Sequence, residues 1–197
     1  MSPRPYNQQL RAERAADTRR RIIDATHHLH IEKGVAATSF RDIAQRADVG
    51  IGTVYHHFPT YEDAIAACGR YTMELVQPPR PELVDGIDDP RARIRALVSE
   101  IFALHQRTPW MGRLRSERSL FPALDRGLVE AELMRHAFID AALRPLRPGN
   151  RTRAFVDALL DFNVYQSLIA SGFEHAAAVE EMSHLLAGRL IKPRRKR

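Results

Sequence analysis

The residues whose types and spacing indicate a function most clearly lie in one short segment, residues 50–58, where small and polar side chains follow one another. Gly50 and Gly52 are unexpected in a helix built for stability, because each glycine costs roughly 1 kcal/mol relative to alanine. Small residues would instead let the backbone approach a phosphate or a base edge closely. The major groove of DNA accepts an α-helix, so a short, exposed helix of this composition suits it.

Catalytic and metal chemistry find little support in the sequence. It contains no Gly-x-Ser-x-Gly string, no glycine-rich phosphate loop and no dinucleotide fingerprint, so we predict no enzymatic activity and no cofactor. The single cysteine, Cys68, and the absence of His-Glu-x-x-His exclude the usual zinc sets. His27, His28 and His30 crowd one helix, but we interpret them as packing or surface residues and predict no metal site.

Composition and charge describe an ordinary globular chain with basic ends. Of the 197 residues, 44% are hydrophobic and 27% charged, and no apolar run is long enough to cross a membrane. The N-terminus lacks the apolar region of a secretory signal, and one cysteine fits a reducing compartment, so we expect a cytoplasmic protein. Residues 1–61 carry nine basic and six acidic side chains, whereas residues 189–197 carry six basic and none acidic. Basic ends suggest a polyanionic partner, although solubility explains the tail equally well.

Helical periodicity extends over nearly the whole chain, which predicts an all-α fold of about nine helices. Three come first: a long one from Asp17 to Gly34, a short one from Ser39, and another short one from Ile51 after the break 48–50. Residues 39–42 and 60–63 resemble capping boxes at helix starts. The sizes and the break are typical of a helix-turn-helix. After the proline-rich linker 77–81 we expect helices near 90–105, 108–114, 122–142, 150–171 and 174–191.

The segment Thr38-Ser39-Phe40-Arg41-Asp42-Ile43-Ala44, together with residues 49–60, resembles the helix-turn-helix signature of the TetR/AcrR transcriptional regulators. The spacing of Gly52, Tyr55 and Phe58 carries much of this resemblance, which covers residues 18–65. The rest of the chain is similar only in length and helix count. The resemblance implies a DNA-binding domain at 17–64 after a flexible basic arm at 1–16, a ligand-binding and dimerisation domain at 65–191, and a basic tail at 192–197.

The resemblance also implies which side chains contact DNA. Arg41 would reach guanine, unless it is a plain surface arginine, and Ser39 is explained equally well as an N-cap. Ile51 could belong to the core or touch a thymine methyl, and we favour DNA. One of Tyr55, His56 and His57 is expected to pack instead, and Tyr61 replaces a usual lysine or arginine. The candidate DNA-binding residues are Thr38, Ser39, Arg41, Gly50, Ile51, Gly52, Thr53, Tyr55, His56, His57, Thr60 and Tyr61.

For the C-terminal part, the resemblance implies a homodimer through the last two helices that binds a palindromic operator. The apolar excess of residues 155–169 and the stripe Met182, Leu185, Leu186 and Leu190 agree with a shared interface. A small, largely apolar effector would bind between the middle helices, shift the fourth helix and release the repressor from DNA. The candidate effector-binding residues are Phe102, His105, Trp110, Met111, Arg115, Met134, Phe138, Asn163, Tyr165 and Gln166.

Two alternatives stay open for regulation. A regulator without a small-molecule effector could act through a protein partner, and its helical bundle would then have a filled core. Cys68 could sense oxidants if its thiolate were favoured, although a cysteine in an apolar helix stripe is usually buried and inert.

Overall fold

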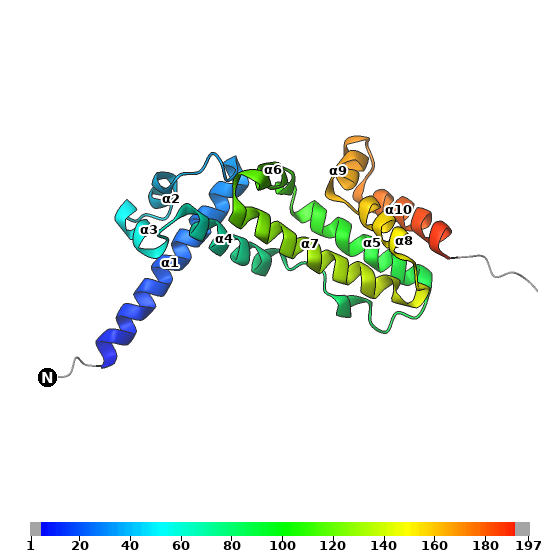
Figure 1. The fold of residues 1–197 in the computed structure, drawn as a ribbon, viewed down its shortest axis with the longest axis horizontal. Helices are drawn as coiled ribbons and strands as arrows, with labels where there is room; N and C mark the ends of the chain where they lie inside the picture. The colour runs from blue at the N-terminus through cyan, green and yellow to red at the C-terminus, as the bar shows by residue number, and fades with distance from the viewer. Residues whose placement is uncertain (1–4, 192–197) are drawn as a thin grey trace, which may run out of the picture. The chain divides into compact units, whose positions relative to one another are not determined.

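The computed structural model describes residues 5–191, and within that range it contains helices joined by turns and loops but no strand (Figure 1). The all-α prediction is therefore confirmed. Ten α-helices and three short 3-10 helices follow one another in this order: α1 Pro5–Lys33, α2 Phe40–Arg46, α3 Ile51–His57, α4 Tyr61–Val76, η1 Pro81–Val84, α5 Pro90–Arg107, α6 Met111–Glu117, η2 Arg118–Leu120, α7 Pro122–Leu143, η3 Arg144–Leu146, α8 Asn150–Leu159, α9 Phe162–Ala170 and α10 His175–Leu190.

The chain divides into two compact units. Unit 1 combines the residues up to 75 with residues 113–128, and unit 2 combines residues 76–112 with those from 129 onward. The expected boundary between residues 64 and 65 does not coincide with this division. Most of α4, most of α6 and the start of α7 cluster with the N-terminal helices. The basic tail 192–197 lies outside the described residues.

The core of unit 1 joins the first four helices around one face of α1. Ile22, Ala25 and Leu29, spaced by three and four residues, pack against Ile43 of α2 and Val54 of α3. Two capping boxes fix the helix starts, as the sequence predicts. Ser39 and Asp42 cap α2 reciprocally, and Thr60 and Asp63 form the same pair of bonds at α4.

The first helix begins earlier than predicted. The predicted start at Asp17 is wrong, because α1 is continuous from Pro5. Residues 5–16 therefore form a helix rather than the expected flexible segment. Residues 8–16 consist of Gln, Leu, Arg, Ala and Glu, all strong helix formers. Proline is tolerated in a first turn, where its missing N–H is not needed. The exposed turns have no core to face, so the sequence carries no apolar periodicity there.

Unit 2 has a core built from α5, α7 and α10, with α8 and α9 packed against it. Inside it, Arg93 of α5 is 9% exposed and donates to the backbone carbonyls of Val84, Ile87, Ala141 and Ala142. A single guanidinium thus donates hydrogen bonds to the backbone carbonyls at the end of α7, at the end of η1 and in the turn after it. No helix among the described residues is long and apolar enough to cross a membrane.

The helix expected at 150–171 is two helices. α8 ends at Leu159, and Asp161 starts α9 as its N-cap by accepting from the amide of Asn163. Asp161 is a suitable N-cap residue, but the sequence is apolar on both sides of it. The pattern therefore predicted one continuous helix instead of two. The apolar surface available for a dimer is also smaller than expected. Val156, Leu160 and Phe162 are buried within the chain, and so are Met182 and Leu186 of the expected stripe.

Candidate nucleic-acid interface

The exposed face of α3 carries the small and polar residues that the sequence singles out. Gly50, Ile51 and Gly52 are exposed, whereas Val54 and the C-cap Phe58 are buried on the opposite side. Ile51 is 45% exposed, which removes the core alternative for this residue. Thr53 is half-buried beside them. The first turn of α3 therefore presents mainly backbone and one branched apolar side chain.

Neither glycine of this turn is required by the fold. Gly50 has φ −67°, and Gly52 does not have a positive φ. A Cβ atom built on Gly52 would meet nothing within 4 Å, and one on Gly50 would meet only the Thr53 hydroxyl at 3.9 Å. At Gly52, inside the helix, packing and backbone geometry would both accept alanine, which favours helices by about 1 kcal/mol. Gly50 is the N-cap of α3, a position where glycine is itself preferred over alanine. The fold therefore explains Gly50 but gives no reason for the small size of Gly52.

Tyr55 and Arg41 extend the same surface. The Tyr55 ring is 52% exposed and stands edge-on to Phe40 of α2, with 4.9 Å between ring centroids. Its hydroxyl projects from a ring that packing has already oriented. Arg41 is exposed, and among the described residues its guanidinium forms no ion pair or hydrogen bond. A guanidinium without a competing carboxylate is suited to a guanine edge or a phosphate.

Two imidazoles and one guanidinium lie close together at the C-terminal end of α3. His56 is exposed and His57 half-buried, with 5.3 Å between their ring centroids. Burial is the largest cause that lowers the pKa of His57, followed by the neighbouring His56 and Arg19. Each of them disfavours the protonated, positively charged form of the His57 imidazole. The Arg19 guanidinium lies 4.8 Å from the centroid of the Phe58 ring. A neutral imidazole can still donate one hydrogen bond to a phosphate oxygen.

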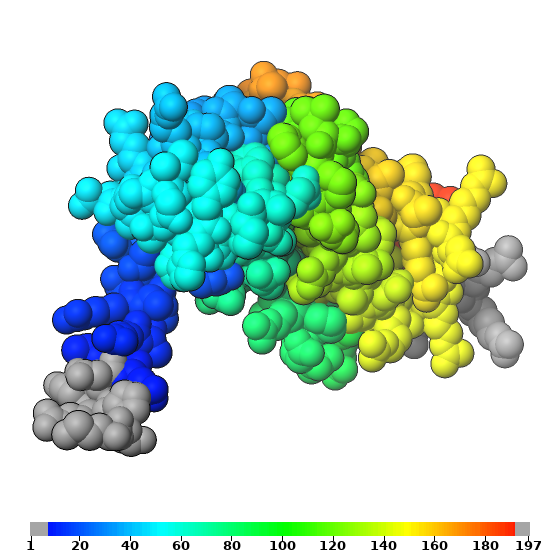
Figure 2. Space-filling model, turned by 60° about the vertical axis from the view of Figure 1, so that its left-hand side comes forward, coloured from blue at the N-terminus to red at the C-terminus, as the bar shows by residue number. Residues whose placement is uncertain are grey.

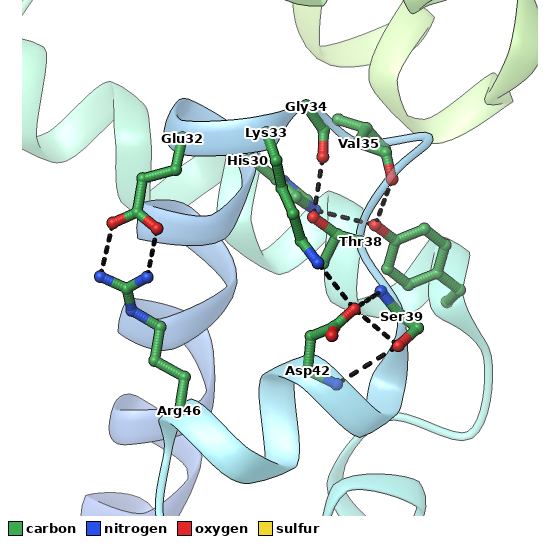
Figure 3. Close-up of polar contacts among 10 residues, drawn as sticks. His30, Glu32, Lys33, Gly34, Val35, Thr38, Ser39, Asp42 and Arg46 are labelled. Carbon is green, nitrogen blue, oxygen red and sulfur yellow. Dashed lines mark hydrogen bonds and ion pairs between the residues drawn. The ribbon is translucent and has the colours of Figure 1, made fainter.

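Two of the predicted contact residues have structural roles in the turn before α2 (Figure 3). Thr38 is buried, and its hydroxyl donates to the carbonyl of Gly34 at 2.7 Å. Ser39 is exposed and bonded to Asp42, whose other partner is Lys33 at 2.8 Å. The Lys33 and Ser39 bonds hold the pKa of Asp42 well below its usual range. The Thr38 side chain is therefore committed to the turn, and Ser39 is an N-cap.

Tyr61 also points into unit 1 rather than outward. Its hydroxyl donates to the carbonyl of Val35 at 2.7 Å and lies 3.0 Å from Nε2 of His30. Burial raises the pKa of the phenol and lowers the pKa of His30 to about 4. The Thr60 amide donates to Asp63 at 3.0 Å, so this amide is not available to a phosphate. The side chain that replaces the family's usual cation thus supports the turn before α2.

One residue that the sequence reasoning missed holds this turn from outside. Glu117 of α6 accepts from the amides of Val35 and Ala36 at 2.7 and 3.3 Å. Gly34 has φ +92°, a conformation that favours glycine, and a Cβ there would lie 2.5 Å from a Glu117 oxygen and would displace that carboxylate. Arg113 of α6 donates to the carbonyl of Glu32 at 2.7 Å. Partners about 80 residues apart leave no local sequence signal.

The predicted effector residues do not form one pocket. Phe102, His105 and Tyr165 are buried with their rings in mutual contact, and Nε2 of His105 lies 2.9 Å from the carbonyl of Leu160. Phe138 is buried in the same core. Trp110, Met111 and Gln166 are half-buried, Met134 and Asn163 are exposed, and Arg115 belongs to unit 1. Two surface hollows of about 470 and 610 Å³ are lined by none of these ten residues.

The structure gives no chemical support to redox control through Cys68. Its side chain is 4% exposed, and burial raises the pKa of the thiol to about 12. The reactive thiolate is therefore disfavoured at neutral pH. The sulfur lies 3.5 Å from Nδ1 of His30, inside the same polar chain that reaches Tyr61. Among the described residues, no group of three or more His, Cys, Asp or Glu side chains could hold a metal ion.

The comparison with protein families addresses the helices described above. Residues 22–68, from α1 to α4, match the model of bacterial regulatory proteins of the tetR family. Among the curated relatives that the chain resembles is the HTH-type transcriptional repressor KstR of Mycolicibacterium smegmatis, 32% identical over 103 residues. That match covers 51% of this chain and 50% of KstR.

A second curated relative is the HTH-type transcriptional regulator BetI of Burkholderia ambifaria, 33% identical over 85 residues. This match covers 43% of this chain and 44% of BetI. The chain thus spans about half the length, or slightly less, of these curated relatives. Both are named as regulators of transcription.

Solved structures extend the likeness to both units. A transcriptional regulator from Rhodococcus sp. Rha1 matches with a TM-score of 0.69 at 20% identity, covering 88% of this chain and 95% of that one. The multidrug binding protein EbrR, solved with proflavin, matches with a TM-score of 0.59 at 26% identity, covering 88% of this chain and 99% of EbrR. The helical C-terminal part therefore also shares the fold of these two proteins.

Proposed function

We propose that the protein is a sequence-specific DNA-binding regulator of transcription that acts as a repressor. One observation carries the proposal: the exposed first turn of α3 contains a glycine, Gly52, that neither its packing nor its backbone needs. Close approach to an outside surface explains it, and the major groove is a surface that fits a seven-residue helix. The family match and the regulator names of the relatives support the same function.

The proposed reading face is the exposed subset of the sequence candidates. Gly50, Ile51 and Gly52 would lie against the bases, with Arg41 on a guanine edge. Tyr55 and the two histidines would donate to the backbone. Thr38 and the Tyr61 side chain are left out of the proposed contacts, because their hydroxyls hold the turn before α2.

We propose a homodimer through the C-terminal helices of unit 2. Phe155 of α8, Ile169 of α9 and Leu185 of α10 are 48%, 36% and 55% exposed although they are large and apolar. Burying them between two copies would remove this surface from water. A two-fold dimer would place two copies of α3 about one helical turn of DNA apart, so the operator would be palindromic.

For control, we propose a small, largely apolar effector that binds among the aromatic residues of unit 2. Gly112 packs against Phe162 there, since a Cβ on Gly112 would lie 3.0 Å from that ring. The chain passes into unit 1 directly afterwards, where Arg113 and Glu117 of α6 hold the end of α1 and the following turn. A shift of α6 would reorient the start of α2. EbrR, a relative in fold and sequence, is named for binding several drugs.

Selection of bound sequences from random duplex DNA, at a stated near-physiological salt concentration, tests the function. Recovery of a short palindrome with half-sites about one helical turn apart is the expected result. A folded protein that recovers no motif, after purification under conditions that remove bound small molecules, would contradict sequence-specific regulation. The same operator then serves to screen apolar compounds for release of the protein.

A further inference from the structure

Four aromatic rings follow one another from the segment before α7 to the exposed face of α3. Phe121, Tyr61, Phe40 and Tyr55 make three successive edge-on pairs, with 5.9, 5.8 and 4.9 Å between ring centroids and 84°, 83° and 82° between ring planes. Edge-on contact at about 4.5–7 Å is an arrangement that aromatic pairs prefer. We call these four residues the aromatic chain. Tyr55 is its exposed end, and Phe121 is its half-buried end outside the helix-turn-helix.

The middle of the aromatic chain is fixed by hydrogen bonds. The Tyr61 hydroxyl donates its hydrogen to the carbonyl of Val35, so towards Nε2 of His30, 3.0 Å away, it can only accept. Nδ1 of His30 is then an acceptor, and the sulfur of Cys68 lies 3.5 Å from it. Tyr61 is therefore held at its hydroxyl by two partners. Its ring cannot move away from Phe40 without losing these bonds.

The Phe121 end is anchored by the segment that follows it. The amide of Ala123, in the first turn of α7, donates to the carboxylate of Glu62 at 2.6 Å, and Glu62 is the neighbour of Tyr61 in α4. Residues 113–128 belong to unit 1, so these contacts lie within one compact unit. In Figure 2 the green atoms of this part of the chain lie against the blue and cyan atoms of the N-terminal helices.

The aromatic chain limits the directions open to Tyr55. This residue belongs to a seven-residue helix and its side chain is 52% exposed, so the helix alone leaves more than one rotamer accessible. An edge-on pair of ordinary strength, such as that with Phe40, favours one orientation by roughly two- to tenfold. Phe40 is itself half-buried, and it also contacts the Tyr61 ring. The direction of the Tyr55 hydroxyl therefore depends on rings that lie behind the exposed face.

We infer that Phe121 and Tyr61 are positioning residues for DNA binding: through Phe40 they hold the Tyr55 hydroxyl where it donates to the DNA backbone. The inference rests on the proposed function, in which Tyr55 contacts DNA. Phe121 lies outside residues 22–68, the part of the chain that matches the family model. The reading face is then completed by a residue beyond the helix-turn-helix.

A double-mutant cycle on the selected operator tests the inference. Phe121→Leu removes the ring at the far end, Tyr55→Phe removes the hydroxyl that this ring would position, and a third protein carries both changes. Phe121→Tyr keeps an aromatic edge, and Leu120→Ala changes a neighbour that is 60% exposed and outside the aromatic chain. Fluorescence anisotropy with the full-length proteins gives the dissociation constants, and thermal unfolding shows that each variant is folded. Phe121→Met takes the place of Phe121→Leu where the leucine variant fails to fold.

Phe121→Leu should weaken operator binding by about two- to threefold, and by no more than Tyr55→Phe does. The double variant should bind as Tyr55→Phe alone does, because the ring then has no hydroxyl to position. Phe121→Tyr and Leu120→Ala should bind as wild type does. Losses that multiply in the double variant would show a merely structural role, and they would overturn the inference, as would wild-type affinity in folded Phe121→Leu. Both results leave the regulator intact, whereas failure of wild type to bind any selected duplex would overturn the proposed function and the inference with it.

Discussion

Gly52 offers a substitution in which stability and DNA binding should change in opposite directions. A methyl group on Gly52 meets no atom of the chain within 4 Å, so alanine is accommodated without repacking. Removing a helical glycine stabilises by up to about 1 kcal/mol, which for a chain of this size raises the melting temperature by roughly 2–4 °C. In the proposed complex the same methyl group would stand between the backbone of α3 and the DNA. Each displaced base contact costs about 1–3 kcal/mol, so we expect at least about a tenfold loss of operator affinity.

Gly69→Ala is the matched control for this experiment. Gly69 lies inside α4, and a Cβ there also meets nothing within 4 Å. Thermal unfolding without DNA and anisotropy on the selected operator at one salt concentration measure both quantities. Gly69→Ala should raise stability and leave operator affinity unchanged. Wild-type affinity in a stabilised Gly52→Ala variant would refute close approach as the reason for the glycine. Equal losses in both variants would point to stiffening of unit 1 instead.

Three further predictions concern single side chains. Tyr55→Phe keeps the edge-on packing against Phe40 but deletes the hydroxyl. It should therefore weaken operator binding severalfold at unchanged melting temperature. Unchanged affinity would remove Tyr55 from the interface. Arg93→Gln leaves buried carbonyls unpaired and should lower the free energy of unfolding by about 3 kcal/mol in urea titration, whereas a loss below about 1 kcal/mol would contradict the role assigned to its four bonds. Because the pKa of His30 is lowered to about 4 from 6.5, the unfolded state binds its proton first, so stability is complete above pH 6.5 and falls as the pH decreases toward 4. His30→Gln should flatten this dependence between pH 6.5 and 5, and an unchanged pH profile would show that His30 does not cause it.

The sequence predicted those parts of the fold that depend on local patterns. The apolar spacing of α1, the capping boxes at Ser39 and Thr60, and the glycines of α3 are all visible within a few residues. Two boundaries were missed for physical reasons. The extension of α1 depends on helix propensity without a buried face, and the break at Asp161 lies in a run that stays apolar on both sides.

The candidate site shows the same limit. The exposure of Ile51 was favoured only through the family resemblance, and the inward direction of Tyr61 could not be anticipated. Its hydroxyl bonds Val35 in a turn whose shape depends on Glu117, a residue about 80 positions away. Contacts of such sequence separation are decided by tertiary packing, which no local pattern encodes. The aromatic contacts of His105 and Tyr165 have the same origin.

The central claim is that the exposed face of α2 and α3 reads bases, and the most direct test is a change of specificity rather than a loss of affinity. Selection from random duplex DNA is performed in parallel with wild type and with Arg41→Ala, whose side chain makes no contact that the fold needs. The account predicts a palindrome from both proteins, with preference lost in the variant at one symmetric position of each half-site. An identical motif from both proteins would contradict base reading by Arg41, and the absence of any motif from wild type would contradict the account as a whole.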